Sequence, residues 1–256
     1  MRPFLHLMIQ LSLIGIGTGN PDHLTGEARR AIASADLFLI PRKADKSDLA
    51  DLRTQIIDTV RDDARVAPFD MPVRDDSLPY LDRVEAWHDE IARIWTATMA
   101  QHPGAQHVAL LVWGDPSLYD STLRIAARLD PAPQVRVIAG ITSVQALTAA
   151  HAIPLNTVNG PVTISTGRRL RDHGWPAGCE TLVVMRDGTC AFQDLDGDAF
   201  AIWWGAYLGR PEQILAHGRL GDVCDDIIAR RAAARAAHGW IMDTYLLRAI
   251  RGLPAK

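Results

Sequence analysis

The residues best suited to chemistry follow an apolar segment that ends abruptly at Gly114, Asp115 and Pro116. That segment, 108–113, reads V-A-L-L-V-W, and such a run is typical of a strand buried on both faces of a parallel sheet. Glycine lets the backbone turn sharply or approach a ligand, and proline fixes the direction in which the chain leaves. Because ligands bind outside the carboxyl ends of strands in open α/β sheets, this loop is a candidate binding loop. An ordinary turn between a strand and a helix could have the same residues.

Two further strands are predicted to end in loops that contain glycine. Residues 10–20 read Q-L-S-L-I-G-I-G-T-G-N, a strand that runs into alternating glycines. Residues 135–143 read V-R-V-I-A-G-I-T-S, a strand that ends in glycine followed by two hydroxyl residues. Since the carboxyl ends of parallel strands meet at one edge of a sheet, we expect the three loops to form the active-site edge.

These glycines do not match the common nucleotide-binding patterns. The dinucleotide fingerprint needs G-x-G-x-x-G leading into a helix, with an acidic residue after the second strand. Here the glycines fall as G-x-G-x-G before Asn20 and Pro21, and the second predicted strand ends in Pro41 and Arg42. No Walker lysine follows any of the loops. Conventional NAD or ATP binding is therefore not expected.

The first part of the chain alternates predicted strands with predicted helices, which is typical of a parallel sheet with helices on both faces. After the first strand, strands are expected at 37–40, 66–71, 108–113 and from 135. Helices are expected over 26–35, 52–63, 80–101, 121–129 and 143–150, and 44–51 is expected to be a polar loop. Thr25 is the expected N-cap of the first helix, with Asp22 as the alternative.

The pattern changes near Asn156, after which short turns separate most predicted elements. Strands are expected over 162–165, 181–185 and 199–204, and helices over 212–217 and 225–237, while 240–250 fits either. This order predicts a smaller mixed sheet. The fold class is therefore α/β, with one α/β domain over residues 1–156 and a second over 157–256.

Composition narrows the class of protein. Of 256 residues, 48% are hydrophobic and 22% charged, as in an ordinary globular protein, and the formal net charge of -3 argues against a nucleic-acid partner. No apolar run approaches the ~20 residues that span a bilayer, so no membrane partner is expected. The three cysteines, Cys179, Cys190 and Cys224, form no metal or disulfide pattern, which favours a reducing cytoplasm.

The apolar N-terminus does not have the features of a signal peptide. His6 and Gln10 interrupt it, and no small-residue cleavage site follows. We expect a short leader over 1–7 that makes no element, and the sequence leaves open whether translation starts at Met1 or Met8.

Taken together and in order, six segments resemble the tetrapyrrole methylases, which transfer methyl groups from S-adenosylmethionine in cobalamin and sirohaem synthesis. The segments are I-G-I-G-T-G-N-P-D-H-L-T (14–25), A-S-A-D-L-F-L-I (33–40), W-G-D-P-S-L-Y (113–119), I-A-G-I-T-S-V-Q-A-L (138–147), I-P-L-N (153–156) and T-L-V-V-M (181–185). The resemblance implies a class III methyltransferase fold, a tetrapyrrole substrate and a homodimer.

Within the family, D-H-L-T, Y-D-S-T-L-R (119–124), S-T-G-R-R-L (165–170) and W-W-G-A-Y-L-G (203–209) resemble one particular member. That enzyme of the aerobic cobalamin route methylates precorrin-5 at C1 and releases acetate. The first loop departs from the family pattern, because the usual G-P-G-D is replaced by G-T-G-N at 17–20. Two other hypotheses stay open: a sibling methylase acting on another tetrapyrrole, on diphthamide or on ribosomal RNA, and a ligand-binding protein without turnover.

The resemblance also implies roles for individual residues. The cofactor, S-adenosylmethionine, and its product, S-adenosylhomocysteine, are expected between the domains, held mostly by backbone groups of Gly114, Asp115, Leu118, Thr142, Ser143, Met185, Ala206 and Tyr207. Met185 could equally be an ordinary core residue. The substrate trough is expected at Gly17, Thr18, Gly19 and Asn20, with Arg124 and Arg168, or alternatively Arg42 and Lys43, pairing with substrate carboxylates.

Release of acetate needs an activated water, for which His23, Asp22 and Tyr119 are the candidate proton-exchanging groups. His23 could also be a solvated loop histidine. No metal site is expected.

Overall fold

The computed structural model describes residues 9–42 and 47–250, which form two α/β units divided between Thr142 and Ser143. The leader and Lys43 lie outside the described residues. The division falls earlier than the boundary expected after Asn156, because helix α5 (Ser143–Ala150) belongs to the second unit. The hydroxyl of Ser143 lies 3.0 Å from that of Thr244, and His151 Nε2 lies 3.0 Å from the carbonyl oxygen of Trp204, both in the second sheet.

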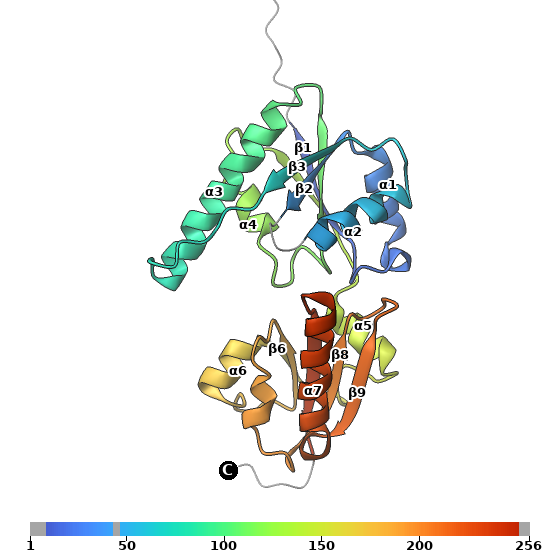
Figure 1. The fold of residues 1–256 in the computed structure, drawn as a ribbon, viewed down its shortest axis with the longest axis vertical. Helices are drawn as coiled ribbons and strands as arrows, with labels where there is room; N and C mark the ends of the chain where they lie inside the picture. The colour runs from blue at the N-terminus through green and yellow to red at the C-terminus, as the bar shows by residue number, and fades with distance from the viewer. Residues whose placement is uncertain (1–8, 43–46, 251–256) are drawn as a thin grey trace, which may run out of the picture. The chain divides into compact units, whose positions relative to one another are not determined.

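The first unit is built on a five-stranded parallel sheet in the order β3-β2-β4-β1-β5 (Figure 1). Its strands are β1 (Gln10–Gly15), β2 (Leu37–Arg42), β3 (Val66–Asp70), β4 (His107–Val112) and β5 (Gln134–Ile138). In register, β1 pairs along its whole length with β4 and along most of it with β5. This confirms the predicted parallel sheet and places the carboxyl ends of β1, β4 and β5 side by side.

Helices cover both faces of this sheet, because apolar side chains along each strand point alternately to one face and to the other. Four helices lie on it: α1 (Gly26–Ser34), α2 (Ser47–Asp58), α3 (Tyr80–Ala100) and α4 (Thr122–Ala126). Ile14 of β1 packs with the helix residues Ile32 and Ile57 on one face, whereas its neighbour Leu13 packs with Trp95 on the other. The predicted N-cap is confirmed, since the Thr25 hydroxyl accepts from Ala28 N at 3.0 Å.

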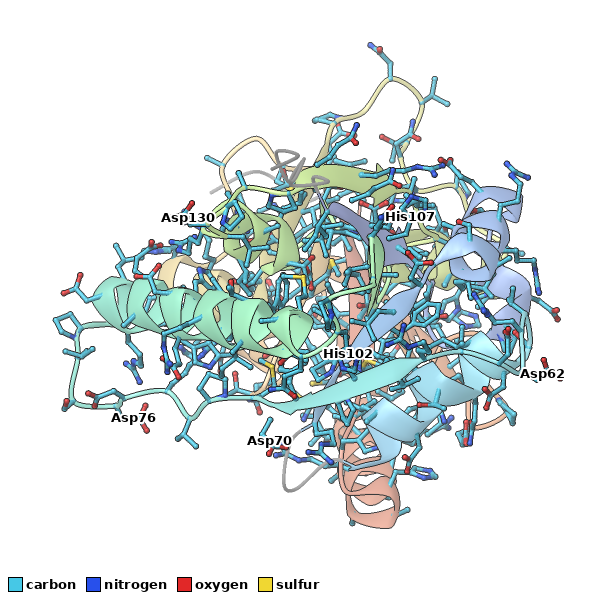
Figure 2. All side chains as sticks on the ribbon, turned by 90° about the horizontal axis from the view of Figure 1, so that it is seen from above. Asp62, Asp70, Asp76, His102, His107 and Asp130 are labelled. Atoms are coloured by element: carbon cyan, nitrogen blue, oxygen red, sulfur yellow. The ribbon has the colours of Figure 1, made fainter. Side chains whose placement is uncertain are left out.

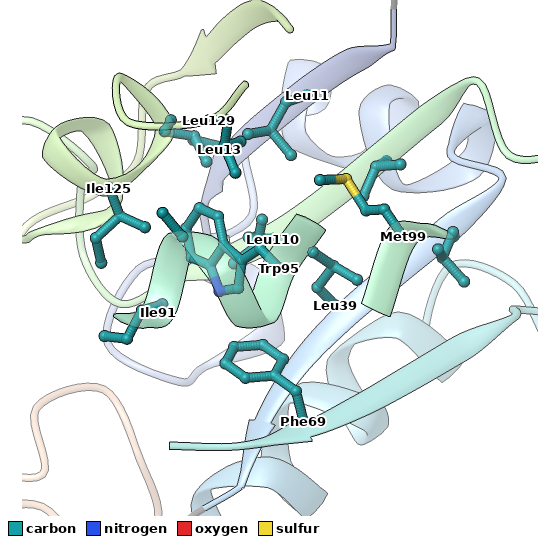
Figure 3. Packing of buried hydrophobic residues seen from close by; sticks show 14 of the residues in the cluster. Leu11, Leu13, Leu39, Phe69, Ile91, Trp95, Met99, Leu110, Ile125 and Leu129 are labelled. Carbon is teal, nitrogen blue, oxygen red and sulfur yellow. The ribbon is translucent and has the colours of Figure 1, made fainter. Parts of the chain in front are cut away.

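Trp95 lies at the centre of the core beneath α3 (Figure 3). It is almost fully buried among side chains from β1, β3 and β4, and its ring meets that of Phe69 edge-on, with 6.3 Å between the centroids. Helix α3 reaches this position because the chain leaves β3 at Asp70, passes Asp76 and returns along α3 to His102 (Figure 2). The packing fixes α3 on the face opposite to α1 and α2.

The second unit contains a mixed sheet in the order β6-β7-β10-β8-β9. Its strands are β6 (Val162–Thr166), β7 (Thr181–Met185), β8 (Phe200–Ala206), β9 (Ile214–Arg219) and β10 (Asp243–Ala249), accompanied by helices α6 (Gly167–His173) and α7 (Leu220–His238). Strand β6 is parallel to β7, while β10 is antiparallel to both β7 and β8. The carboxyl ends of β6, β7 and β8 therefore share one edge.

Two predicted elements are wrong. Residues 212–217 were expected to be helical, but Ile214–Arg219 is the edge strand β9, because hydrogen bonding to β8 overrides the local helix propensity of this segment. The expected loop over 44–51 is helical from Ser47, because α2 buries Ala50, Ile56 and Ile57 against the first sheet. The segment 240–250, which fitted either element, contains strand β10.

The described residues include no helix that is long and apolar enough to cross a bilayer.

Three glycines bring the loops of the first unit into direct backbone contact. A Cβ on Gly15 would lie 2.6 Å from Gly140 N and 2.9 Å from Gly114 O. A Cβ on Gly140 would overlap Gly114 O and lie 2.8 Å from Gly15 Cα. Because backbone atoms cannot move aside as side chains do, only glycine fits at positions 15 and 140, where the backbone at the ends of β1 and β5 approaches the Gly114 carbonyl.

We expect Gly140→Ala to lower the free energy of unfolding by about 1–3 kcal/mol through overpacking of this contact. Thermal unfolding followed by calorimetry measures the effect. Gly104→Ala is the matched control, because a Cβ at Gly104 has no atom within 4 Å. Equal midpoints for the two variants would contradict the close packing.

Candidate functional site

The first two loops of the first unit are joined by a short two-way backbone contact. Gly114 N donates to Gly17 O at 2.7 Å, and Gly17 N donates to Gly114 O at 3.3 Å. Both residues have positive φ, +65° at Gly114 and +69° at Gly17, a conformation that strongly favours glycine. The predicted substrate loop and the predicted cofactor loop therefore lie against each other.

Asp115 ties its loop to the third loop. Its Oδ2 accepts from Gly140 N at 2.9 Å, and its Oδ1 accepts from Ser117 N at 2.8 Å and from the Ser117 hydroxyl. Partial burial raises the pKa of Asp115, but the hydrogen bonds from Ser117 and Gly140 outweigh it and hold the pKa below its usual range. Because its two oxygens accept from Ser117 in its own loop and from Gly140 in the third loop, the carboxylate positions these two loops.

The loop from Gly17 to His23 is compact. Asn20 Oδ1 caps a short 3-10 turn (Pro21–His23) by accepting from Asp22 N at 2.9 Å. His23 packs on Gly17, where a Cβ would lie 2.6 Å from His23 Cβ, and its Nδ1 lies 3.0 Å from the Thr18 hydroxyl. No hydrogen bond joins His23 Nε2 to another described residue. His23 is thus half-buried with one ring nitrogen held, whereas Asp22 is exposed.

The other predicted residues of the first unit follow β4. Leu118 N donates to Asp115 O at 3.2 Å, and Tyr119 has positive φ (51°) and is 37% exposed, so its ring is only partly covered. Arg124 Nη1 donates to Asp120 O at 2.9 Å, which keeps the guanidinium beside this loop. These residues follow the Gly114 loop closely in sequence.

In the second unit, three predicted cofactor residues gather at the start of β10. Thr244 pairs with Met185 of β7 on one side and with Gly205 of β8 on the other, and Asp243 pairs with Ala206. The Ser143 hydroxyl lies within hydrogen-bond distance of the Thr244 hydroxyl and so is held at the start of β10. Thr244 is buried and was missed, since nothing in the sequence indicated which element 240–250 forms.

Tyr207 is built into the second unit by its polar atoms. Its buried hydroxyl donates to Trp240 O at 2.5 Å and lies 3.3 Å from Ala234 O, and burial raises the pKa of this hydroxyl. Its N–H donates to Met242 O at 3.0 Å. Tyr207 therefore shapes the loop after β8 more than it exposes groups for a ligand. Arg168 is an exposed residue of α6 in the same unit.

A buried ion pair fixes the start of β10. Asp243 Oδ2 accepts from Arg231 Nε at 2.9 Å and from Trp204 Nε1 at 3.1 Å, while Arg231 Nη2 donates to Asp187 O at 2.7 Å. Burial raises the pKa of Asp243 despite the neighbouring guanidinium. The pair was missed because Arg231 lies in an alanine- and arginine-rich helix without a clear apolar face.

The two edges thus present backbone groups, hydroxyls and the apolar side chains of Leu118 and Met185. Among the described residues, no group of His, Cys, Asp and Glu side chains is arranged to hold a metal ion.

Comparison with known proteins gives one consistent result. Residues 10–224 match the family model described as Tetrapyrrole (Corrin/Porphyrin) Methylases. A precorrin-6A synthase (deacetylating) from Sinorhizobium sp is 47% identical over 250 residues, which cover 94% of this chain and 95% of that protein.

Comparison with solved structures gives the same family of proteins. A cobalamin synthesis related protein (CobF) from Corynebacterium diphtheriae has a TM-score of 0.81 at 38% identity, covering 94% of this chain and 98% of that one. A uroporphyrin-III C-methyltransferase from Thermus thermophilus, complexed with S-adenosyl homocysteine, shares the fold at 18% identity, with a TM-score of 0.58 and coverage of 93% and 97%. The match over residues 10–224 and the 47% identity over 94% of the chain show that this chain belongs to the tetrapyrrole (corrin/porphyrin) methylase family.

Proposed function

We propose that this protein is an S-adenosylmethionine-dependent C-methyltransferase that methylates precorrin-5 at C1 and releases acetate to give precorrin-6A. The observation that carries the proposal is the 47% identity to a precorrin-6A synthase (deacetylating) over 94% of the chain. The match covers 94% of the chain and therefore spans both units. The expected homodimer and cytoplasmic location stay predictions.

Mass spectrometry of the tetrapyrrole after incubation with precorrin-5 and S-adenosylmethionine tests this activity. The expected product has gained one methyl group and lost the acetyl group, and acetate accumulates in equal amount. Methylation without acetate would favour a sibling methylase, and binding without turnover would favour a ligand-binding protein.

The residues of both units suit this cofactor. S-adenosylmethionine supplies an electrophilic methyl group on a cationic sulfonium, which needs no basic side chain beside it. We assign its binding to backbone and hydroxyl groups of Gly114, Leu118 and Thr142 in the first unit and of Ser143 and Ala206 in the second, with Met185 as an apolar contact. Asp115 and Tyr207 support these groups, because their polar atoms are engaged within their own units.

Methyl transfer from a sulfonium requires alignment and exclusion of water, and little covalent help from the protein. The packed glycine loops supply a rigid base for that alignment. In this proposal Gly17, Thr18, Gly19 and Asn20 line the tetrapyrrole site, and Arg124 and Arg168 pair with substrate carboxylates.

Release of acetate is a separate step. A water adds to the acetyl carbonyl, the carbon–carbon bond to the macrocycle breaks, acetate leaves, and the bonding electrons stay in the macrocycle. The base assigned to this water is His23 Nε2, in the tautomer whose Nδ1–H donates to the Thr18 hydroxyl. Asp22 and Tyr119 are the alternative proton-exchanging groups.

We expect Asp115→Ala to weaken S-adenosylhomocysteine binding by roughly 10-fold, because it removes the hydrogen bonds to Gly140 and Ser117 and loosens the loop after β4. Isothermal calorimetry measures the affinity. Asp115→Asn, which keeps an acceptor oxygen, should lose less. Wild-type affinity in a folded Asp115→Ala protein would count against this placement of the cofactor.

We expect His23→Ala to slow acetate release by about 10²–10⁴-fold, the usual contribution of a general base. Affinity for S-adenosylhomocysteine should stay within about twofold of wild type, a difference of less than 0.5 kcal/mol. His173→Ala, at an exposed residue of α6, is the control. An unchanged rate of acetate release would make His23 an ordinary loop residue.

A further inference from the structure

The first sheet opens at its carboxyl edge between β2 and β4. These two strands pair only at Leu37 with Val108 and at Phe38 with Ala109 among the described residues, although β2 continues to pair with β3 as far as Arg42. The chain leaves β2 toward β3 and leaves β4 toward β5, at opposite ends of the strand order. Such switch points are where open α/β sheets bind ligands.

Arg53 of α2 fills this opening. Its Nε donates to Leu111 O at 3.0 Å, an oxygen on the part of β4 that β2 no longer reaches, and its Nη1 donates to Leu49 O at 3.0 Å. The guanidinium carbon lies 4.9 Å from the centre of the Trp113 ring. Trp113 directly precedes the Gly114 loop, so this cation lies beside the proposed site.

The charge on Arg53 has no matching anion within the described residues. No described carboxylate lies within ion-pair distance of it, and no described residue accepts from Nη2. Burial lowers the pKa of Arg53 to about 10, while the more distant charge of Asp120 acts in the opposite direction. The group is therefore a cation at neutral pH, and its side chain is half-buried.

Arg231 and Arg248 provide the comparison. Arg231 is buried and pairs with Asp243 at 2.9 Å. Arg248 has no carboxylate partner, yet three protein oxygens accept from it, those of Pro154, Leu155 and Thr181. Beside Arg53, the indole N–H of Trp113 is buried without a partner, whereas no nitrogen of Arg53 is both buried and unpartnered, so Nη2 stays open to a ligand. A buried polar group without a partner is costly and calls for an explanation such as a functional role.

We infer that Arg53 and Trp113 form a subsite that binds one side-chain carboxylate of the tetrapyrrole substrate at the opening between β2 and β4. The inference rests on the proposed function for the identity of the substrate. The carboxylate accepts a charge-assisted hydrogen bond from Arg53 Nη2, and the guanidinium keeps its stack on Trp113. Arg53 is then a substrate-binding residue that no sequence motif indicated.

The test measures binding of uroporphyrin III, a stable polycarboxylate tetrapyrrole, and of its carboxamide derivative by fluorescence quenching. We expect Arg53→Gln to weaken uroporphyrin III binding by about 10- to 100-fold, the effect of one charge-assisted hydrogen bond. The variant should also lose the preference of the wild type for the acid over the amide. Arg53→Lys should recover part of the affinity, because it keeps the charge.

Two controls separate this role from a structural one. Arg93→Gln removes an exposed charge of α3 and should bind like wild type. Affinity for S-adenosylhomocysteine and the thermal midpoint report whether Arg53→Gln and Arg53→Lys remain folded. With precorrin-5, the Arg53 variants should raise KM more than they lower kcat.

The outcomes distinguish the two proposals. Wild-type protein that fails to prefer the acid, or a folded Arg53 variant that keeps the preference, would overturn the subsite. An equal loss in Arg93→Gln would overturn it as well, since the effect would then be one of net charge. A preference that depends on Arg53, in an enzyme that releases no acetate from precorrin-5, would support the subsite and refute the proposed reaction.

Discussion

The contact among Gly15, Gly114 and Gly140 is the constraint on which the first unit depends. Where three neighbouring parallel strands end, their backbones touch, so no side chain can separate the loops. The Gly17–Gly114 contact and the Asp115 carboxylate then extend this contact outward. As a result, the loop that carries His23 and the loop that carries Leu118 are fixed by backbone geometry, which gives the rigidity that an alignment-dependent reaction requires.

In the second unit, a different interaction fixes the residues at the edge of the sheet. There a buried ion pair, Asp243 with Arg231, holds the start of β10, and Thr244 then links Ser143 to the strand that Met185 and Gly205 flank. Breaking such a pair would leave a buried charge uncompensated, which costs far more than the pair itself contributes. The position of the hydroxyl pair therefore depends on a network that lies beneath it.

The sequence predicted the elements whose signal is local. The apolar runs of β1 and β4, the Thr25 cap and the periodic apolar face of α3 each determine one element, and all were found. Strand β9 was missed because its residues favour a helix in isolation and only pairing with β8 makes them a strand. Arg53 was missed for the same kind of reason: its meaning depends on where β2 and β4 diverge, and no spacing along the chain records that.

The distribution of charge at the carboxyl edge of the first sheet fits the two ligands proposed for it, a cationic sulfonium and a tetrapyrrole that carries carboxylates. The carboxylate of Asp115, in the loop after β4, accepts hydrogen bonds from the N–H and O–H groups of Ser117 and from the N–H of Gly140. These bonds offset its negative charge, so the loop proposed to bind a cationic sulfonium stays close to neutral. The guanidinium of Arg53 lies beside Trp113, which directly precedes this loop, and no described carboxylate forms an ion pair with it. A nearly neutral loop can bind a cationic ligand without forming a strong ion pair with it. A guanidinium without a carboxylate partner attracts a carboxylate of the ligand. Under the two proposals, the first unit separates the two recognition tasks, because the charge of Asp115 is satisfied within the protein and that of Arg53 is left for the substrate.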